Sequence, residues 1–206
     1  MSFPLPHTHI VTLFTAFGDQ SMILPFVTAV AITLWLGDAW REAAIWTFAI
    51  CAVLFMMLVL KLFFLPCGHL IPEWHLRSPS GHAASAFAAY GSFAVLEAKL
   101  RQVQWQKIAI LVLGFMFAAG IAISRVLIGA HTTQEVILGT LVGLAAPAII
   151  FWTIKTPVRN AVAGLLLLAL ALPVALLVIL NGQTLPIEDH ILSLALAITQ
   201  RLGVCL

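Results

Sequence analysis

The sequence predicts an all-α membrane protein, a polytopic helical bundle with about six transmembrane helices. Of its 206 residues, 62% are hydrophobic and only 9% are charged, whereas soluble domains usually carry about a quarter of charged residues. A soluble fold cannot hide this much apolar surface, because part of its exterior must stay polar enough to face water. A lipid bilayer removes the difficulty, since it is itself an apolar solvent.

Hydropathy along the chain supports the bundle. A span needs roughly 20 mostly apolar residues, and a short polar stretch separates each candidate from the next. Six segments qualify: about 21–37, 42–65, 82–98, 106–128, 133–153 and 160–180.

The two ends of the chain are less uniformly apolar than the six candidate spans. Residues 7–20 are apolar with polar punctuation and are predicted to form a short helix in the membrane interface. The tail, residues 187–206, fits either a short seventh span or a second interfacial helix. With no repeat or linker, residues 1–206 form a single membrane-embedded domain, whose motif-bearing core covers about 20–150.

The distribution of positive charge predicts the orientation. Cytoplasmic loops carry the excess of Lys and Arg. With six spans, one side of the membrane holds three cationic residues, and the other holds Arg41, Lys99, Arg101, Lys107, Lys155 and Arg159. This bias puts the N-terminus and the histidine-bearing loops outside, which for a bacterial inner membrane means the periplasm.

Charge and cysteine content exclude other classes. The net charge of +2 is small and dispersed, without aromatic–basic interleaving, which argues against nucleic-acid binding. Cys51, Cys67 and Cys205 have neither metal-ligand nor CxxC spacing. A disulfide between Cys67 and Cys205 would require both to face an oxidising compartment. The N-terminal segment does not resemble a cleaved signal peptide.

Three polar clusters lie at the outer ends of predicted spans. The first is Lys61, the second is RSPSGH at 77–82, and the third combines Arg125 with His131 and Glu135. Each alone is unremarkable, because a terminal Lys usually snorkels and Pro-Ser-Gly usually makes a turn and helix cap. Their occurrence together on one membrane face indicates a shared site.

These groups suit a phosphate ligand, whose oxygens need several donors at once. Lys61, Arg77 and Arg125 supply positive charge, Ser80 supplies a hydroxyl, and Gly81 lets backbone N–H groups approach an anion closely.

Two histidines beside a phosphate site suggest a nucleophile and a proton donor, because imidazole can do either near neutral pH. The four-residue step from His131 to Glu135 places both on one helix face. A carboxylate there can accept the proton of one ring nitrogen and leave the other directed at phosphorus. A purely structural hydrogen-bonded pair is the alternative interpretation.

The pattern resembles the type 2 phosphatidic acid phosphatase superfamily over about residues 20–150. That family carries Lys with Arg-Pro seven residues on, then Pro-Ser-Gly-His, then Ser-Arg with His six residues after the Arg and a carboxylate four further. Here the second part is complete as PSGH at 79–82, and the third stands as Ser124-Arg125, His131 and Glu135. The first is half present, with Lys61 but Gly68 where the arginine is expected.

The resemblance implies a role for each matching residue. His131 would attack phosphorus and form a phosphohistidine, with its ring held by Glu135, where the family more often uses Asp. His82 would protonate the leaving lipid oxygen. The phosphate would be bound by Lys61, Ser80, Gly81 and Arg125.

The missing arginine of the first motif has a candidate replacement in Arg77, three residues before Ser80. His69 and His75, in the same loop, lie outside the pattern and are more readily exposed or headgroup-contacting residues than metal ligands. Neither a metal nor another cofactor is expected.

The predicted function is therefore that of a membrane lipid phosphatase. Its substrate would be a lipid phosphate or pyrophosphate of isoprenoid, phosphatidate, phosphatidylglycerol phosphate or lipid A type, and its partners the phosphorylated lipid and the bilayer. A lipid phosphotransferase of the same fold and a non-catalytic lipid-binding or transport protein remain alternatives. The motifs leave the particular lipid and the oligomeric state open.

Overall fold

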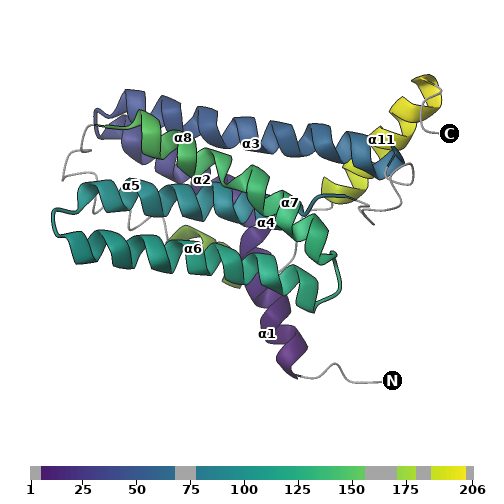
Figure 1. The fold of residues 1–206 in the computed structure, drawn as a ribbon, viewed down its shortest axis with the longest axis horizontal. Coiled ribbons are helices and arrows are strands. Elements are labelled where there is room, and N and C mark those ends of the chain that lie inside the picture. Colours follow the sequence, from purple (N-terminus) through teal and green to yellow (C-terminus); the bar gives the residue numbers. More distant parts are fainter. Residues whose placement is uncertain (1–5, 68–77, 156–170, 180–186, 203–206) are drawn as a thin grey trace.

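The computed structural model describes residues 6–67, 78–155, 171–179 and 187–202, which form helices and no strand. The all-α prediction is confirmed, and Figure 1 shows the long helices lying side by side along the longest axis of the molecule. In chain order the elements are α1 (Pro6–Thr15), η1 (Ala16–Gly18), α2 (Gln20–Leu36), α3 (Trp40–Cys67), α4 (Gly81–Ala86), η4 (Phe87–Gly91), α5 (Ser92–Leu100), α6 (Gln104–Leu127), α7 (Thr133–Gly143), α8 (Ala145–Thr153), α10 (Ala171–Ile179) and α11 (Ile187–Leu202).

The core of the bundle is a continuous helical segment made of α4, η4 and α5. Every residue from 83 to 98 is buried, and the segment packs against α3, α6, α7 and α8. Its first half is rich in alanine and serine, so neighbouring helices can approach closely. A π-helical turn, η4, interrupts the α-helical pattern in the middle of this segment.

The prediction of six spans is not supported by the described residues. By length and composition, three helical stretches there can cross a membrane: Trp40–Cys67, Gln104–Leu127 and Thr133–Thr153. A fourth is added if Val11–Gly18 and Gln20–Leu36, which meet at 47°, are counted as one bent span.

The shortfall has identifiable origins. The predicted third span, 82–98, is helical but is divided by η4. The predicted sixth, 160–180, lies largely outside the described residues, which include only α10 of it. The segment at 7–20, predicted to be a short helix in the interface, is helical as α1 and η1, leads into α2, and packs on α6 through α1.

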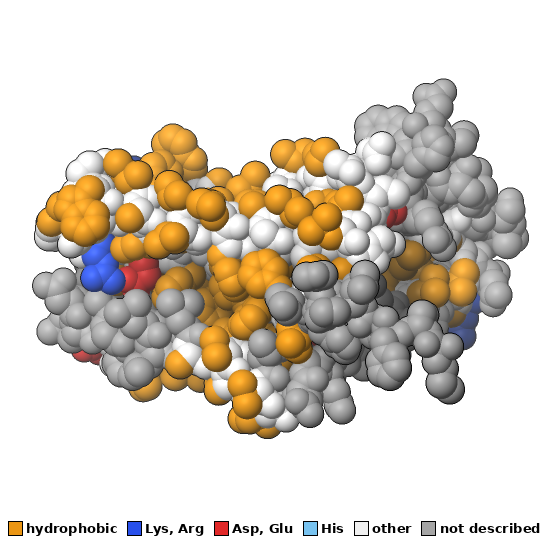
Figure 2. Space-filling model, turned by 90° about the horizontal axis from the view of Figure 1, so that it is seen from below, with side chains coloured by type: hydrophobic (Ala, Val, Ile, Leu, Met, Phe, Trp, Pro, Cys, Tyr) orange, Lys and Arg blue, Asp and Glu red, His pale blue; other side chains and the backbone are white. Residues whose placement is uncertain are grey.

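The outer surface is apolar, as a lipid-facing surface should be. Figure 2 shows hydrophobic side chains over much of one face of the molecule. Large side chains such as Trp35, Phe48 and Trp152 are more than 60% exposed. In water such exposure would be costly, whereas in hydrocarbon it is not.

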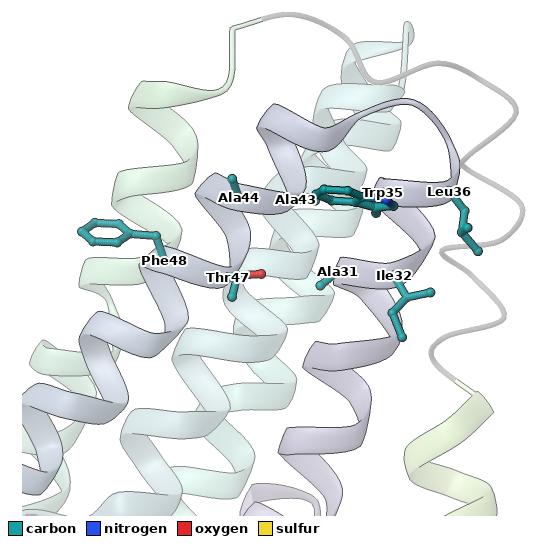
Figure 3. A pocket seen from close by; sticks show the side chains of 8 residues that line it. All are labelled: Ala31, Ile32, Trp35, Leu36, Ala43, Ala44, Thr47 and Phe48. Carbon is teal, nitrogen blue, oxygen red and sulfur yellow. The ribbon is translucent and has the colours of Figure 1, made fainter.

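A groove of about 530 Å³ lies between α2 and α3, close to the turn that joins them (Figure 3). It is lined by Ala31, Ile32, Trp35, Leu36, Ala43, Ala44, Thr47 and Phe48. These side chains include no titratable group, and the groove lies at the opposite end of α2 and α3 from Asp19 and Lys61. It is therefore not the site that the motifs predict.

Candidate active site

The predicted site residues gather at one end of the bundle. Five helix ends meet there: the starts of α2, α4 and α7 and the ends of α3 and α6. In Figure 1 this is the end of the bundle toward which α11 lies. Residues 68–77, and with them Arg77, Gly68, His69 and His75, lie outside the described residues.

His131 and Glu135 are in direct contact at the start of α7. Nδ1 of His131 lies 3.0 Å from Oε2 of Glu135, and both side chains are more than 90% buried. When Nδ1 donates to the carboxylate, a neutral imidazole keeps Nε2 unprotonated and able to act as a nucleophile. The Thr132 backbone N–H also donates to Oε2, at 3.0 Å, and the Thr132 hydroxyl accepts from the Glu135 N–H. This capping box fixes the helix start and with it the carboxylate.

Glu135 also binds the second motif. Its other oxygen, Oε1, accepts from the Ser78 backbone N–H at 3.0 Å, and its carbonyl oxygen accepts from the Ser80 N–H at 3.0 Å. One residue therefore orients the histidine of the third motif and holds the loop of the second in place.

Close helix packing supports this junction. Gly139 lies one turn beyond Glu135, where a Cβ would collide with the Ser80 carbonyl oxygen. At Gly143 a Cβ would lie 2.5 Å from the Ala84 carbonyl oxygen. Two glycines four residues apart thus let α7 lie directly against the backbone of α4.

Ser80 is fully buried and caps α4, its hydroxyl oxygen accepting from the Ala83 N–H at 3.4 Å. A hydroxyl that accepts at a cap can still donate its own proton, so the capping contact is compatible with the predicted contact to a phosphate oxygen.

Arg125 is joined to His131 through the backbone. The Arg125 carbonyl oxygen accepts from the N–H groups of Ala130 and His131, at 3.0 and 3.2 Å. Gly129, with a φ of 68°, provides the left-handed residue that this tight turn needs. The Arg125 guanidinium reaches α1, with Nη1 3.5 Å from the Thr15 hydroxyl.

A cavity of about 330 Å³ adjoins His82. Its polar end holds Lys61, Gly81 and His82, and Lys61 is 6% exposed. Away from these groups the wall becomes apolar and includes residues of α2, α3 and α11. The full lining is Gly18, Asp19, Gln20, Leu24, Leu54, Met57, Leu58, Lys61, Gly81, His82 and Ile191. His131 does not line this cavity. It is connected to the cavity through Glu135, which contacts both the His131 ring and the loop at 78–81.

One residue of this site was missed by the sequence reasoning. Oδ2 of Asp19 lies 3.7 Å from Nε2 of His82, and both side chains are largely buried. The available signal was a helix-capping Asp-Gln-Ser at the outer end of an apolar segment. Because 7–20 was predicted to lie in the interface, nothing placed Asp19 near His82.

The described residues contain no group of three or more His, Cys, Asp or Glu side chains that could hold a metal ion. The site consists instead of cations, imidazoles and carboxylates, which together can bind a phosphate and transfer protons.

Fold and site together define a class: a helical membrane protein with a histidine–carboxylate pair and a cation-bearing cavity at one end. Residues 62–159 match the family model of the PAP2 superfamily, which confirms the resemblance drawn from the motifs and supports a phosphatase-type fold. A protein of Klebsiella pneumoniae, described as "Uncharacterized 22.5 kDa protein in cps region", is 33% identical over 139 residues. That alignment covers 66% of each chain. No solved structure matches the chain.

Proposed function

We propose that this protein is a membrane lipid phosphatase that hydrolyses a lipid phosphate or pyrophosphate through a phosphohistidine intermediate. The observation that carries the proposal is the cavity beside His82. It joins a buried lysine and a histidine at one end to an apolar wall of Leu24, Leu54 and Leu58. A phosphate on an acyl or isoprenyl chain has the same two-part chemistry.

In the first half of the reaction, Nε2 of His131 forms a bond to phosphorus while the bond from phosphorus to the lipid oxygen breaks. His82 gives its proton to the departing oxygen. In the second half, water attacks the phosphohistidine, the P–N bond breaks, His82 takes up the proton of the water, and inorganic phosphate leaves. With a lipid pyrophosphate the leaving group is the lipid monophosphate.

The charge that develops on the phosphate oxygens requires donors already in place. Lys61 and Arg125 are assigned this role with Arg77, the hydroxyl of Ser80 and the backbone N–H of Gly81. The burial of Lys61 supports the assignment, because a charge removed from water interacts more strongly with a bound anion.

The site is proposed to face the periplasm from the inner membrane. Cys67, six residues beyond Lys61 at the same end of α3, is disulfide-bonded. Disulfides persist in oxidising compartments, so this bond agrees with the charge bias of the loops. Cys51, the other cysteine among the described residues, is free.

The decisive experiment is to trap the intermediate. Purified protein is mixed with a ³²P-labelled lipid phosphate in detergent, quenched, and tested for label that is stable to alkali and lost in acid. We expect labelled wild type, unlabelled His131→Ala, and normal labelling of His190→Ala, which removes an exposed histidine of α11.

Two outcomes would replace the proposal. Lipid binding without labelled protein or released phosphate, across substrates of isoprenoid, glycerolipid and lipid A type, would indicate a non-catalytic lipid-binding protein. Labelled protein that releases phosphate only when a second lipid is added would indicate a phosphotransferase.

A further inference from the structure

Asp19 occupies an unusual position for a carboxylate. It lies at the break between η1 and α2, is 6% exposed, and α2 is mostly apolar beyond Ser21. Ionisable groups at the edge of a membrane span are costly and are normally paired or functional.

The two oxygens of Asp19 have different partners. Oδ1 accepts from the Ser21 N–H at 2.9 Å and caps α2. Oδ2 faces Nε2 of His82 at 3.7 Å. Glu135 divides its oxygens in a similar way, since Oε1 binds the loop N–H of Ser78 while Oε2 binds His131.

The backbone around Asp19 is fixed by the helix that carries His82. The Ser85 hydroxyl donates to the Gly18 carbonyl at 2.8 Å, and the Tyr90 hydroxyl donates to the Phe17 carbonyl at 2.9 Å. A Cβ on Gly18 would lie 2.7 Å from Ile121 and 3.1 Å from the Cβ of His82. The distance between Asp19 and His82 is therefore set by the packing of η1 against the central helical segment and α6.

Building on the phosphatase function above, we propose that Asp19 is the positioning residue of His82, holding a proton on Nε2 so that Nδ1 does the proton transfer in both halves of the reaction. In the protonated ring, Nε2–H faces the carboxylate and Nδ1–H is given to the leaving lipid oxygen. The neutral ring then keeps its proton on Nε2, so Nδ1 can accept a proton from the attacking water. Each catalytic imidazole thus has its own carboxylate, Glu135 for His131 and Asp19 for His82.

Leaving-group chemistry separates this role from a purely structural one. An alkoxide leaves phosphorus only when protonated, whereas 4-nitrophenolate leaves without help. In Asp19→Asn we expect kcat/KM for dodecyl phosphate to fall on the order of 10²-fold, the lower range of what a positioned proton donor contributes. We expect kcat/KM for 4-nitrophenyl phosphate to change by less than about threefold, because that step needs no proton donor. The kcat for 4-nitrophenyl phosphate should nevertheless fall, and phosphoenzyme should accumulate, because the water that hydrolyses the phosphohistidine is no longer deprotonated efficiently.

The variants are chosen to keep the helix cap. Asn and Ser cap helices about as well as Asp, so Asp19→Asn and Asp19→Ser both test the charge without removing the cap. Asp38→Asn, in the turn between α2 and α3 at the far end of the bundle, is the matched control and should retain wild-type kinetics with both substrates. Its positive φ of 59° is one that Asn also adopts readily.

A double-mutant cycle completes the test. In a His82→Ala background, Asp19→Asn should cause no further loss with dodecyl phosphate, because the residue acts through His82. Equal losses with both substrates, or an additional loss without His82, would show that Asp19 only stabilises the fold and would leave the phosphatase function intact. A wild type that hydrolyses neither substrate would instead overturn the phosphatase function itself.

Discussion

At the residue scale, the candidate site contains two buried carboxylates, Asp19 and Glu135, that each contact more than one partner. Glu135 accepts three hydrogen bonds on its side chain, from Ser78, His131 and Thr132. Sequence spacing predicts the His131 contact, because residues four apart share a helix face. It cannot predict the contact to Ser78, 57 residues earlier, or that between Asp19 and His82, because both depend on how separate helices pack.

Glu135→Gln should reduce activity severely for this reason. A glutamine has one acceptor oxygen, so either Ser78 or the His131 ring would face an NH₂ group instead of an acceptor. We expect kcat/KM for a lipid phosphate to fall on the order of 10³-fold or more, comparable with loss of the orienting carboxylate in a hydrolase triad.

Phosphoenzyme formation measured by rapid quench should slow to the same extent as turnover in Glu135→Gln. The neighbouring Gln134→Ala, at an exposed position of α7, is the control and should behave as wild type. Wild-type labelling rates in Glu135→Gln would mean that the carboxylate does not orient the nucleophile.

At the element scale, the second motif is held against α7 by close backbone contact. The sequence shows Gly139 and Gly143 four residues apart in an apolar segment, which is common in membrane helices. The helix that they admit is α4, the start of the central segment, and hydropathy alone does not reveal it. The same packing explains why 82–98, although apolar enough to resemble a lipid-facing span, lies inside the bundle.

Gly139→Ala should destabilise the protein and impair catalysis together. Its methyl group would meet the Ser80 carbonyl oxygen, a backbone atom that cannot rotate away. Overpacking of this kind costs about 1–3 kcal/mol, more than the roughly 1 kcal/mol that Ala gains over Gly in a helix. Because Ser80 is displaced, kcat/KM should fall beyond any loss of folded protein.

Gly91→Ala is the matched substitution, since its methyl group would lie 3.4 Å or more from its nearest neighbours. Thermal unfolding in detergent should show a lower midpoint for Gly139→Ala than for Gly91→Ala, and activity should follow the same order. An unchanged midpoint and unchanged kinetics in Gly139→Ala would contradict the close contact between α4 and α7.

At the scale of the whole molecule, composition was sufficient to predict an all-α membrane protein, and the motifs picked out residues that the fold brings together at one end of the helices. The described residues do not support the predicted count of six spans, because hydropathy registers apolar length and is insensitive to the bend at Asp19 and to the π-helical turn in the central segment. Nor did the sequence indicate that α11 would approach the site, where Ile191 contributes to the cavity wall.

The shape of the cavity beside His82 predicts how kcat/KM depends on the length of the substrate's alkyl chain. Leu54 lies two helical turns before Lys61, about 10 Å along α3, so a chain whose phosphate meets Lys61 would pass it. Leu54→Trp should fill this part of the cavity of about 330 Å³ and remove burial for two or three methylene groups. At about 0.8 kcal/mol per methylene, the loss is roughly 2 kcal/mol, or about 30-fold in kcat/KM.

The loss should appear with hexadecyl phosphate and be small with butyl phosphate, whose chain ends before Leu54. Phe55→Trp, at the adjacent and exposed position on α3, places the same indole on the surface away from the cavity and should leave both substrates unaffected. Equal losses with the long and short chains would mean that the lipid tail leaves the site by another route, and that the cavity beside His82 accommodates the headgroup alone.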